Sequence, residues 1–440
     1  MKKYFIQTFG CNMNESDSER IKTVVEGLSY QPTTSQDDAD LLIFNTCAVR
    51  QSAENRVIGQ LAKVPTLRKA NPDLKVIIAG CMVQENRDDL ARRLPEVDIF
   101  LSIRDLPALP EKLGFATPAT ELPSYMEIRP TSNLQYKKVI PIISGCDNFC
   151  TFCVVPYARG RELSRRMEDV LTEVSEAVAD GAKEIWLVGQ IVNHYQAELP
   201  TGKSSKYTNS LAVLLEQVNA LPGDFRVTFT SSHPNYMTED LVRAVVELPK
   251  VMPYIHLPVQ AGNDEILLRM NRKYTAAKYR EVIAMIHRIA PKICFTTDIL
   301  LGFCNETEEA WNDTIQLFKD GNFAMAYINQ YSQRPNTVAA RFFKDNIARS
   351  VKIRRDKEIT EVLRKQSHAF NEKFIGTTVR VLVDEKKGRF LFGKSDHFRT
   401  VKFIAPQDSE KLMGSFVHVA ISGCDDWGLK GVLTEDDVTA

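Results

Sequence analysis

The first 115 residues alternate between short apolar runs and longer stretches with helical spacing. Three of the runs are short and apolar enough to be strands buried on both faces: residues 3–8, 40–44 and 74–79. A capping-box pattern at Ser16 and Glu19 predicts a helix over residues 21–28, and further helical stretches begin near Ser52 and after Cys81. Strands that alternate with helices in this way predict an open parallel α/β sheet.

A cysteine follows each of these three strands. Cys11, Cys47 and Cys81 lie just past the predicted carboxyl ends. The carboxyl ends of parallel strands meet at one edge of a sheet, and ligands bind at that edge. The pattern therefore predicts that three thiols distant in sequence come together, although they could instead be structural thiols at strand ends.

A Pro- and Thr-rich segment at residues 116–133 predicts a linker, after which the alternation resumes. Six strand candidates follow, at residues 139–143, 184–188, 226–230, 254–259, 293–299 and 324–330. Helical stretches lie between them, among them residues 167–179, 211–220 and 276–289. Six strand–helix units predict a partial (β/α)6 barrel with its functional groups at the strands' carboxyl ends.

Near residue 373 the pattern changes from helices to short strands and turns. A basic helix over residues 350–370 leads into strand candidates at residues 378–384, 389–393, 401–403 and 415–422. This predicts a small all-β barrel of the kind that binds RNA. The expected organisation is an α/β domain over residues 1–117, a central barrel over 132–368 and a β-barrel over 371–437.

Composition places the chain among ordinary globular proteins. Of 440 residues, 44% are hydrophobic and 25% charged, and 56 Lys and Arg balance 56 Asp and Glu. No run approaches the roughly 18 apolar residues of a membrane span, and the N-terminus lacks a secretory pattern. We expect a cytoplasmic protein without membrane association. Zero net charge disfavours binding nucleic acid by bulk electrostatics.

Three cysteines stand together at Cys146, Cys150 and Cys153, among nine in all. An odd number without a signal peptide favours metal or redox chemistry over disulfides. Three thiolates on one loop suit zinc or an iron–sulfur cluster. A closed zinc site usually adds a second cysteine pair or two histidines, and no such pair is present at ligand spacing. On a four-iron cluster, three cysteines would leave one iron open to a small molecule.

The spacing Cys146-x3-Cys150-x-Phe152-Cys153 resembles the radical S-adenosylmethionine (SAM) signature, and residues 145–162 resemble its methylthiotransferase version. The strings at residues 8–14, 45–47 and 79–81 resemble that family's N-terminal cysteine motifs. The C-terminal barrel is similar to its RNA-binding TRAM domain. The resemblance covers about residues 3 to 435.

The resemblance implies two 4Fe–4S clusters. Cys146, Cys150 and Cys153 would hold the cluster that binds SAM and cleaves it to a 5′-deoxyadenosyl radical. Cys11, Cys47 and Cys81 would hold an auxiliary cluster that carries or supplies sulfur. One SAM would donate the methyl group and another would act as the radical source, with electrons from a low-potential flavodoxin- or ferredoxin-like donor.

Polar groups at the barrel's strand ends are candidate SAM contacts. They resemble family motifs at Phe152, Gly189, Gln190, Asn193, Ser232, Gln260 and Arg272. Each could instead cap a helix or satisfy a loop. His233, Cys294 and Cys424 are expected to have no role in the chemistry.

Related branches of the family modify isopentenyl-adenosine in tRNA, threonylcarbamoyl-adenosine in tRNA, or an aspartate of a ribosomal protein. The motifs at residues 9–14, 45–50 and 155–165 favour the first, at a tRNA anticodon stem-loop carrying isopentenyl-adenosine. Expected RNA contacts are basic residues near the cluster loops and in the C-terminal barrel: Arg50, Arg159, Arg161, Arg165, Arg166, Lys387, Arg389, Lys394 and Arg399. The alternatives are the threonylcarbamoyl branch and a non-catalytic RNA-binding protein with structural metal. The basic and aromatic residues of the barrel could instead belong to a solvated hairpin whose aromatic side chains lie in the core.

Two positions depart from the family pattern. Asn12 stands where Gln is usual. Residues 302–307 read Gly-Phe-Cys-Asn-Glu-Thr, without the usual Pro and second Gly. The local turn geometry at Cys304 and Asn305 is therefore in question, whereas no expected cluster ligand is changed.

Overall fold

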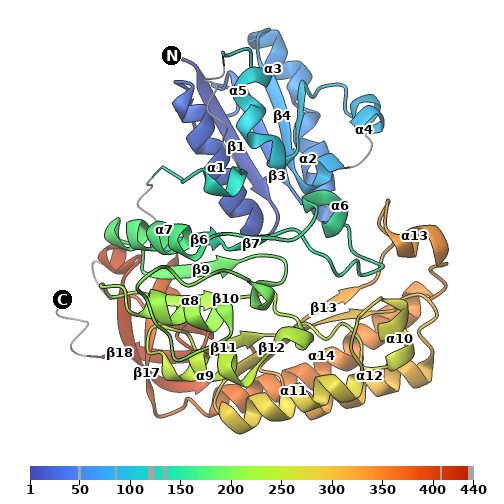
Figure 1. Cartoon of the computed structure of the whole chain (residues 1–440), viewed down its shortest axis with the longest axis vertical. Coiled ribbons are helices and arrows are strands. Elements are labelled where there is room, and N and C mark those ends of the chain that lie inside the picture. The colour runs from blue at the N-terminus through green and yellow to red at the C-terminus, as the bar shows by residue number, and fades with distance from the viewer. Residues whose placement is uncertain (48–50, 85–86, 117–123, 132–135, 407–408, 435–440) are drawn as a thin grey trace.

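The computed structural model describes residues 1–47, 51–84, 87–116, 124–131, 136–406 and 409–434. An α/β domain lies at the top of Figure 1, with a partial barrel below it and a small β-barrel beside that. Half of the linker predicted at residues 116–133, namely residues 117–123 and 132–133, lies outside the described residues. No helix within the described ranges is long and apolar enough to cross a membrane.

The N-terminal domain is a five-stranded sheet in which every pairing is parallel, as predicted. Its order is β2-β1-β3-β4-β5, with β1 Lys3–Phe9, β2 Gln31–Pro32, β3 Leu41–Thr46, β4 Lys75–Gly80 and β5 Ile99–Leu101. Its helices are α1 Asn12–Gly27, α2 Gln51–Leu61, α3 Val64–Ala70 and α4 Arg87–Arg93. Alternate residues of the strands enter opposite cores, since Phe44 and Ile78 belong to one and Ile43 and Ile77 to the other. Burial on both faces explains the nearly continuous apolar runs.

Helix α1 begins earlier than the capping-box pattern indicated. Its N-cap is Cys11, in extended conformation, whereas Ser16 and Glu19 lie inside the helix. Ser16 is buried and its hydroxyl accepts a 2.7 Å hydrogen bond from Arg20. The predicted start was wrong because these polar residues serve packing against the next domain.

Short helices lead from the first sheet to the central domain. They are η2 Ile103–Ala108, α5 Leu109–Lys112 and η3 Tyr125–Glu127, while η1 Cys81–Gln84 follows β4 within the first domain. Tyr125 of η3 is buried, and its phenol lies 2.9 Å from the Ser144 hydroxyl of the central domain. The connection is therefore anchored to both domains.

The central domain contains the six predicted parallel strands. They form two three-stranded sheets, β6-β9-β10 and β11-β12-β13, which backbone bonds of Val227 to Lys250 and Met252 join. The strands are β6 Lys137–Pro141, β9 Glu184–Val188, β10 Arg226–Phe229, β11 Tyr254–His256, β12 Cys294–Leu301 and β13 Met325–Gln330. The pair β7 Ile143–Ser144 and β8 Leu163–Ser164 is antiparallel. The partial (β/α)6 barrel is confirmed.

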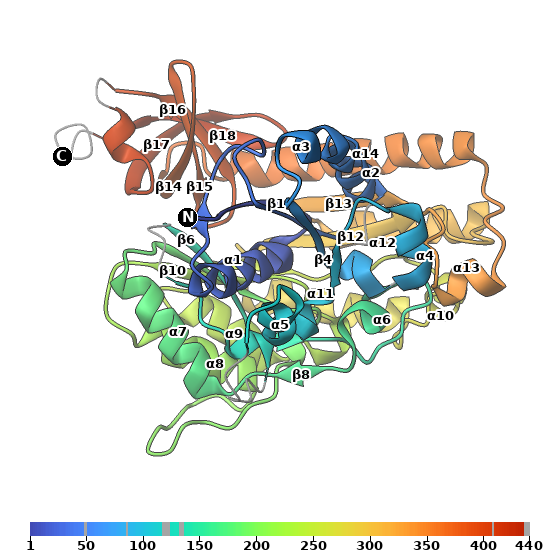
Figure 2. The ribbon, with the colours of Figure 1, turned by 90° about the horizontal axis from the view of Figure 1, so that it is seen from above.

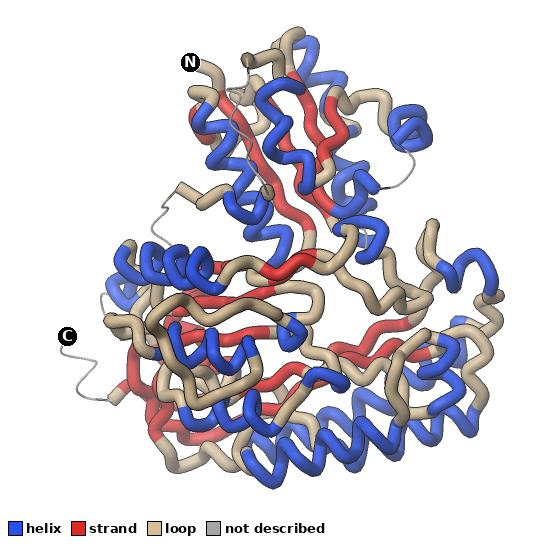
Figure 3. The backbone as a smooth tube through the Cα atoms, in the orientation of Figure 1, coloured by secondary structure: helices blue, strands red, loops and turns tan. Residues whose placement is uncertain are grey.

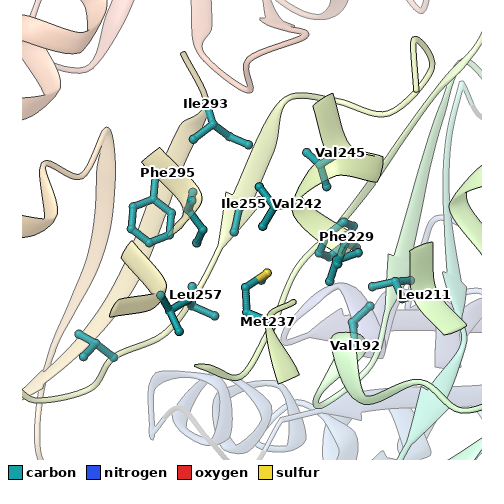
Figure 4. Packing of buried hydrophobic residues seen from close by; sticks show 14 of the residues in the cluster. Val192, Leu211, Phe229, Met237, Val242, Val245, Ile255, Leu257, Ile293 and Phe295 are labelled. Carbon is teal, nitrogen blue, oxygen red and sulfur yellow. The ribbon is translucent and has the colours of Figure 1, made fainter. Parts of the chain in front are cut away.

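Helices cover the outer face of these strands. They are α7 Met167–Ala179, α8 Ser210–Asn219, α9 Glu239–Glu247, α11 Ala276–Ile289, α12 Glu308–Gly321 and α14 Arg349–Glu372, with short α6 Val155–Arg159, η4 Val192–His194, η5 Pro234–Tyr236, α10 Asp264–Arg269 and α13 Val338–Phe342. Figure 4 shows Ile255 of β11 beside Val242 of α9, and Leu257, which follows β11, near Met237. The largest apolar core thus lies outside the strands and leaves their inner face for other groups.

The C-terminal domain is a closed barrel of order β14-β15-β16-β18-β17. Its strands are β14 Thr378–Lys387, β15 Phe390–Ser395, β16 Thr400–Ile404, β17 Phe416–Cys424 and β18 Gly428–Leu433, with η6 Ser409–Leu412. The first four strands confirm the prediction. Strand β18 was missed because Gly428, Lys430 and Gly431 break its apolar alternation.

The three domains are packed against one another, as Figure 2 shows from above and Figure 3 by element type. Helix α1 docks on β6 and α7 through a buried ion pair of 2.9 Å between Arg20 and Glu173. The β-barrel inserts Phe398, whose ring lies 5.1 Å from Trp186 and 4.8 Å from Tyr254. Trp186 belongs to the inner face of the partial barrel, so the β-barrel closes one end of it.

Candidate active site

Cys11, Cys47 and Cys81 follow three adjacent strands of the first sheet. In register, Phe9 of β1 pairs with Thr46 of β3, and Thr46 with Gly80 of β4. Cys47 continues this ladder, since its N–H donates to the Phe9 carbonyl at 2.9 Å. Cys47 and Cys81 are buried and Cys11 is exposed. The structure therefore brings the three residues to one edge of the sheet, as expected, while their role as ligands stays a prediction.

Buried amides hold this edge in shape. Asn45 donates to the carbonyl of Asn14 at 2.8 Å and to the hydroxyl of Ser18 at 2.9 Å. Gly80 has a φ of +94°, and a Cβ there would clash with the Asn45 side chain and lie 2.5 Å from the Thr46 carbonyl oxygen. Within the described ranges, the buried Thr46 hydroxyl has no hydrogen-bond partner. Only glycine fits before Cys81, and a polar atom faces this region unsatisfied.

The tight cysteine loop is shaped by its backbone and held by the segment after α10. Gly145 and Phe149 have φ of +82° and +48°. The Thr151 N–H donates to the Met270 carbonyl at 3.0 Å, and the Asn271 amide donates to the Phe149 carbonyl at 2.9 Å. The loop is therefore a defined cradle, and sequence reasoning missed the part that Asn271 plays in it.

Cys146 is buried and Cys150 and Cys153 are half-buried on this loop. Burial, followed by smaller effects that include the neighbouring Cys150, raises the pKa of Cys146 to about 11 and that of Cys153 to about 12. Arg272 donates to the Cys150 sulfur at 3.4 Å, and the Val155 N–H donates to the Cys153 sulfur at 3.4 Å. These thiols need a cationic centre in order to ionise, and donors already point at two of the sulfurs.

Among the described residues, no three His, Cys, Asp or Glu side chains converge tightly enough to hold a single metal ion. Each site nevertheless offers three soft sulfur ligands. Those at the sheet edge lie near the unsatisfied Thr46 hydroxyl, and those on the loop lie near the donors Arg272 and Val155. Soft thiolate ligands suit an iron–sulfur cluster, whose ligands stand farther apart than those of one ion. The residues present therefore fit the two clusters.

Polar atoms without partners mark the ends of β9 and β10. In the described part of the chain, Gln190 Oε1 and Ser232 Oγ are buried without a hydrogen-bond partner. A Cβ on Gly189 would lie 2.8 Å from the Ile143 carbonyl oxygen, so the chain approaches closely there. Buried unsatisfied groups in a native fold call for a ligand or water. This edge fits SAM, which carries matching polar groups.

Other expected SAM contacts are already engaged within the protein. The Asn193 amide donates to the His233 carbonyl at 2.9 Å and accepts from the His233 N–H at 2.7 Å. Arg272 donates to the Pro258 carbonyl at 3.2 Å and to the Tyr274 hydroxyl at 3.0 Å, besides Cys150. These two residues join loops to one another, and contact with SAM stays a prediction for them.

Phe152 and Gln260 line the same end of the barrel. The Phe152 ring packs edge-on against Phe303 at 6.3 Å. Gln260 has a φ of +72°, and its N–H donates to the Asp298 carbonyl at 2.8 Å. The unusual turn at residues 302–307 lies nearby, where Asn305 takes a φ of +64° in place of glycine and Cys304 is buried. Asparagine tolerates this conformation, so the turn forms without the usual residues.

Three of the arginines expected to contact RNA are buried, which corrects those assignments. Arg159 pairs with Asp17 at 2.6 Å, Arg165 pairs with Glu173 at 2.7 Å, and Arg399 donates to Asn371 at 2.7 Å. Arg159 and Arg399 thereby join two domains, whereas Arg165 pairs within the central domain with the same glutamate that Arg20 binds. The sequence showed the three charges but not the acidic and amide partners, which are distant in sequence for Arg159 and Arg399.

Arg159 links the two cysteine sites. It ends helix α6, which begins two residues after Cys153, and it contacts the Cys81 thiol in the other domain. Burial raises the pKa of Cys81, and the Arg159 charge opposes that rise. Arg159 also donates to the Tyr125 hydroxyl at 3.3 Å. Asp17 and Tyr125 carry no motif, so no signal in the sequence identified them.

The remaining basic residues are divided between surface and interface. Arg161 and Arg166 are exposed and pair with the nearby Asp147 and Glu168. Lys394 is half-buried beside Phe398, donates to Thr400 at 2.7 Å and has a pKa lowered by burial. Arg50 lies outside the described residues.

An exposed basic and aromatic surface covers β15 and β16. Lys402 lies 3.9 Å from the centre of the Phe390 ring and Arg389 lies 5.1 Å from it. Lys387 is close to Phe392 at 5.7 Å. Cations beside half-exposed rings suit phosphate contact and base stacking.

Comparison with known proteins identifies both main domains. Residues 3–102 match the family described as Uncharacterized protein family UPF0004, and residues 140–318 match the Radical SAM superfamily. In fold, the chain is similar to the radical SAM methyltransferase TsrM from Kitasatospora setae, with a TM-score of 0.55 over 75% of this chain and 73% of that one. Identity there is 13%, so the likeness supports the fold alone.

Two relatives similar along nearly their whole length carry the same name. The chain is 35% identical to a protein of Chromobacterium violaceum over 98% of both chains. It is 38% identical to a protein of Chloroflexus aurantiacus over 99% of this chain and 92% of that one. Both are named tRNA-2-methylthio-N(6)-dimethylallyladenosine synthase. With this similarity along the whole chain and both cysteine sites in place, the chain belongs to the radical SAM tRNA methylthiotransferase family.

Proposed function

We propose that this chain is a tRNA methylthiotransferase that places a methylthio group on isopentenyl-adenosine beside the anticodon. The observation that carries the proposal is that the edge with Cys11, Cys47 and Cys81 meets helix α6, which follows the loop with Cys146, Cys150 and Cys153: Ala158 packs on Cys81, and Arg159 pairs with Asp17. The names of the full-length relatives favour the dimethylallyl, or isopentenyl, substrate over the threonylcarbamoyl one. A substrate in tRNA also favours a cytoplasmic location.

The bound cofactors would supply one-electron chemistry, sulfur and a methyl group, and the protein supplies their placement. Cys146, Cys150 and Cys153 would hold the cluster that receives SAM. Arg272 keeps a positive charge beside Cys150 and ties the loop to the end of β11. Gln190 and Ser232 offer buried polar atoms to SAM.

The protein also has to exclude water and present the RNA. The packed rings of Phe398, Trp186 and Tyr254 close the end of the partial barrel that faces the β-barrel. The exposed residues Arg161 and Arg389 and the half-exposed Lys402 are placed to contact phosphates near the cysteine loop and on the β-barrel. A low-potential flavodoxin- or ferredoxin-like protein is the proposed electron donor.

Nucleoside analysis of tRNA from a deletion strain tests the substrate. We expect isopentenyl-adenosine to accumulate, its 2-methylthio form to vanish, and the wild-type chain to restore it. Persistence of 2-methylthio-isopentenyl-adenosine would contradict the proposal. Loss of only the 2-methylthio form of threonylcarbamoyl-adenosine would assign the chain to the other branch.

Anaerobic purification tests the two sites separately. The protein should contain iron and sulfide for two clusters, whereas zinc without iron would support a non-catalytic RNA-binding protein. Replacing Cys11, Cys47 and Cys81 by Ala should halve the iron, preserve SAM cleavage and abolish methylthiolation. Continued methylthiolation by this variant would show that the auxiliary site is misassigned.

A further inference from the structure

The inner face of strands β11–β13 carries polar and aromatic side chains that neither cysteine site uses. Along these strands Ile255, Phe295 and Ile299 face the outer core. The alternate residues Tyr254, His256, Thr296, Asp298 and Tyr327 therefore face inward. Ring contacts agree, since Tyr327 lies edge-on to His256 at 5.7 Å.

This inner group lies between a closed floor and the cysteine loop. Phe398 packs between Trp186 and Tyr254 and forms the floor. On the same strand, Pro258 is two residues beyond His256, and Arg272 bridges its carbonyl to the Cys150 sulfur. Two residues of a strand span about 7 Å. The group therefore lies about 7 Å farther into the partial barrel than Pro258, the residue after β11 that Arg272 contacts.

The polar atoms of the group form a chain with one accessible end. His256 Nδ1 lies 3.0 Å from the Thr296 hydroxyl, which donates to Tyr254. His256 Nε2 lies 3.5 Å from Asp298 Oδ1, so the buried imidazole borders that carboxylate on one side. The Asp298 side chain is 29% exposed and Tyr327 is 46% exposed, although both lie on the inner face of the partial barrel. Solvent therefore reaches an aromatic ring and a carboxylate acceptor beside the cofactor region.

We propose that Tyr327 and Asp298 bind the target nucleobase, with His256 as a positioning residue for the carboxylate. This proposal rests on the proposed function. A planar base stacks on the exposed tyrosine ring. The N6 nitrogen of an alkylated adenine retains one N–H, which the Asp298 carboxylate accepts. The ligand class is an N6-monosubstituted purine nucleotide within RNA.

Binding of an RNA stem-loop to the SAM-loaded holoenzyme tests the site. Three synthetic RNAs carry isopentenyl-adenosine, N6-dimethyl-adenosine or an abasic nucleotide at the target position, and fluorescence anisotropy gives each Kd. We expect Tyr327→Leu to weaken binding of the isopentenyl-adenosine RNA about tenfold and to leave the Kd of the abasic RNA unchanged. Tyr327→Phe keeps the ring and should restore binding to within about twofold.

Asp298→Ala tests the acceptor, because it removes both carboxylate oxygens, whereas Asn would keep an accepting amide oxygen. The wild-type protein should prefer the isopentenyl RNA to the N6-dimethyl RNA, which has no N–H, and the variant should lose this preference. Equal iron content and unchanged thermal melting establish that each variant is folded.

Two results would overturn the proposal: a Tyr327→Leu protein that binds the isopentenyl RNA as tightly as wild type, or one that weakens all three RNAs equally. If wild type itself binds the isopentenyl and abasic RNAs alike and modifies neither, the proposed function has failed and not only this site.

Discussion

The buried pair of Asp17 and Arg159 fixes the contact between the domain of the first three cysteines and the loop of the second three. Arg159 Nη2 lies 2.6 Å from Asp17 Oδ2, and the Asp17 and Arg159 side chains are 1% and 2% exposed. Within the described residues, the second Asp17 oxygen has no hydrogen-bond partner. Arg159→Met keeps most of the apolar stem but leaves a carboxylate buried without its counter-charge.

Removing one member of a buried pair costs about 3–5 kcal/mol. Replacing both members by apolar residues is often close to neutral. We therefore expect Arg159→Met to lose about 3–5 kcal/mol and the double variant with Asp17→Leu to recover most of it.

Hydrogen exchange along α1 measures this loss, because a three-domain chain does not unfold in one step. The free energy of local opening of α1 should fall in the single variant and recover in the double one, with α11 as an unaffected internal reference. A single variant within 1 kcal/mol of wild type would refute the reasoning. So would a double variant as unstable as the single one, since the cost would then come from lost packing and not from the isolated charge.

Three further predictions address the site, the acid response and the RNA surface. Gly80→Ala should lower the iron content from two clusters toward one, because the added Cβ clashes with Asn45 and Thr46. The control Gly114→Ala has a similar φ but no atom within 4 Å of the added Cβ, so it should retain both clusters. Equal iron content in the two variants would show that the clash is unimportant. Burial lowers the pKa of His233 to about 2, so the unfolded chain takes up the proton first as the pH falls. The free energy of opening of the central domain, measured by hydrogen exchange, should therefore decrease by about 1.4 kcal/mol between pH 7.5 and 5.5, and His233→Asn should remove that slope. Arg389→Gln and Lys402→Gln should each reduce the salt dependence of tRNA binding by about one phosphate contact, whereas Arg399→Gln should loosen the β-barrel without changing the salt slope; a change of slope in the last variant would mean that buried Arg399 meets RNA after all.

Much of the architecture could be predicted from local pattern. Strands buried on both faces leave apolar runs, and the run at residues 184–188 is identical to β9. The helices predicted at residues 167–179 and 276–289 also match α7 and α11. Strand β18 and the start of α1 could not be predicted, because glycines in one and domain-docking polar residues in the other mask the apolar period.

The sequence by itself determined which residues can bind metal, because cysteine spacing and position after a strand are local properties of the chain. It also determined the order of the three domains. Tertiary structure alone decided what each charge is for: Arg159, Arg161 and Arg165 occupy one basic segment, yet Arg159 and Arg165 find buried acidic partners and Arg161 stays exposed. It alone placed Tyr327 beside Asp298 and His256, since these residues belong to three strands that only parallel pairing brings together. Spacing along the chain reports which residues are neighbours in the sequence. The role of a charged group is set by its burial and by its ion-pair partner, and both depend on residues that are far away in the sequence.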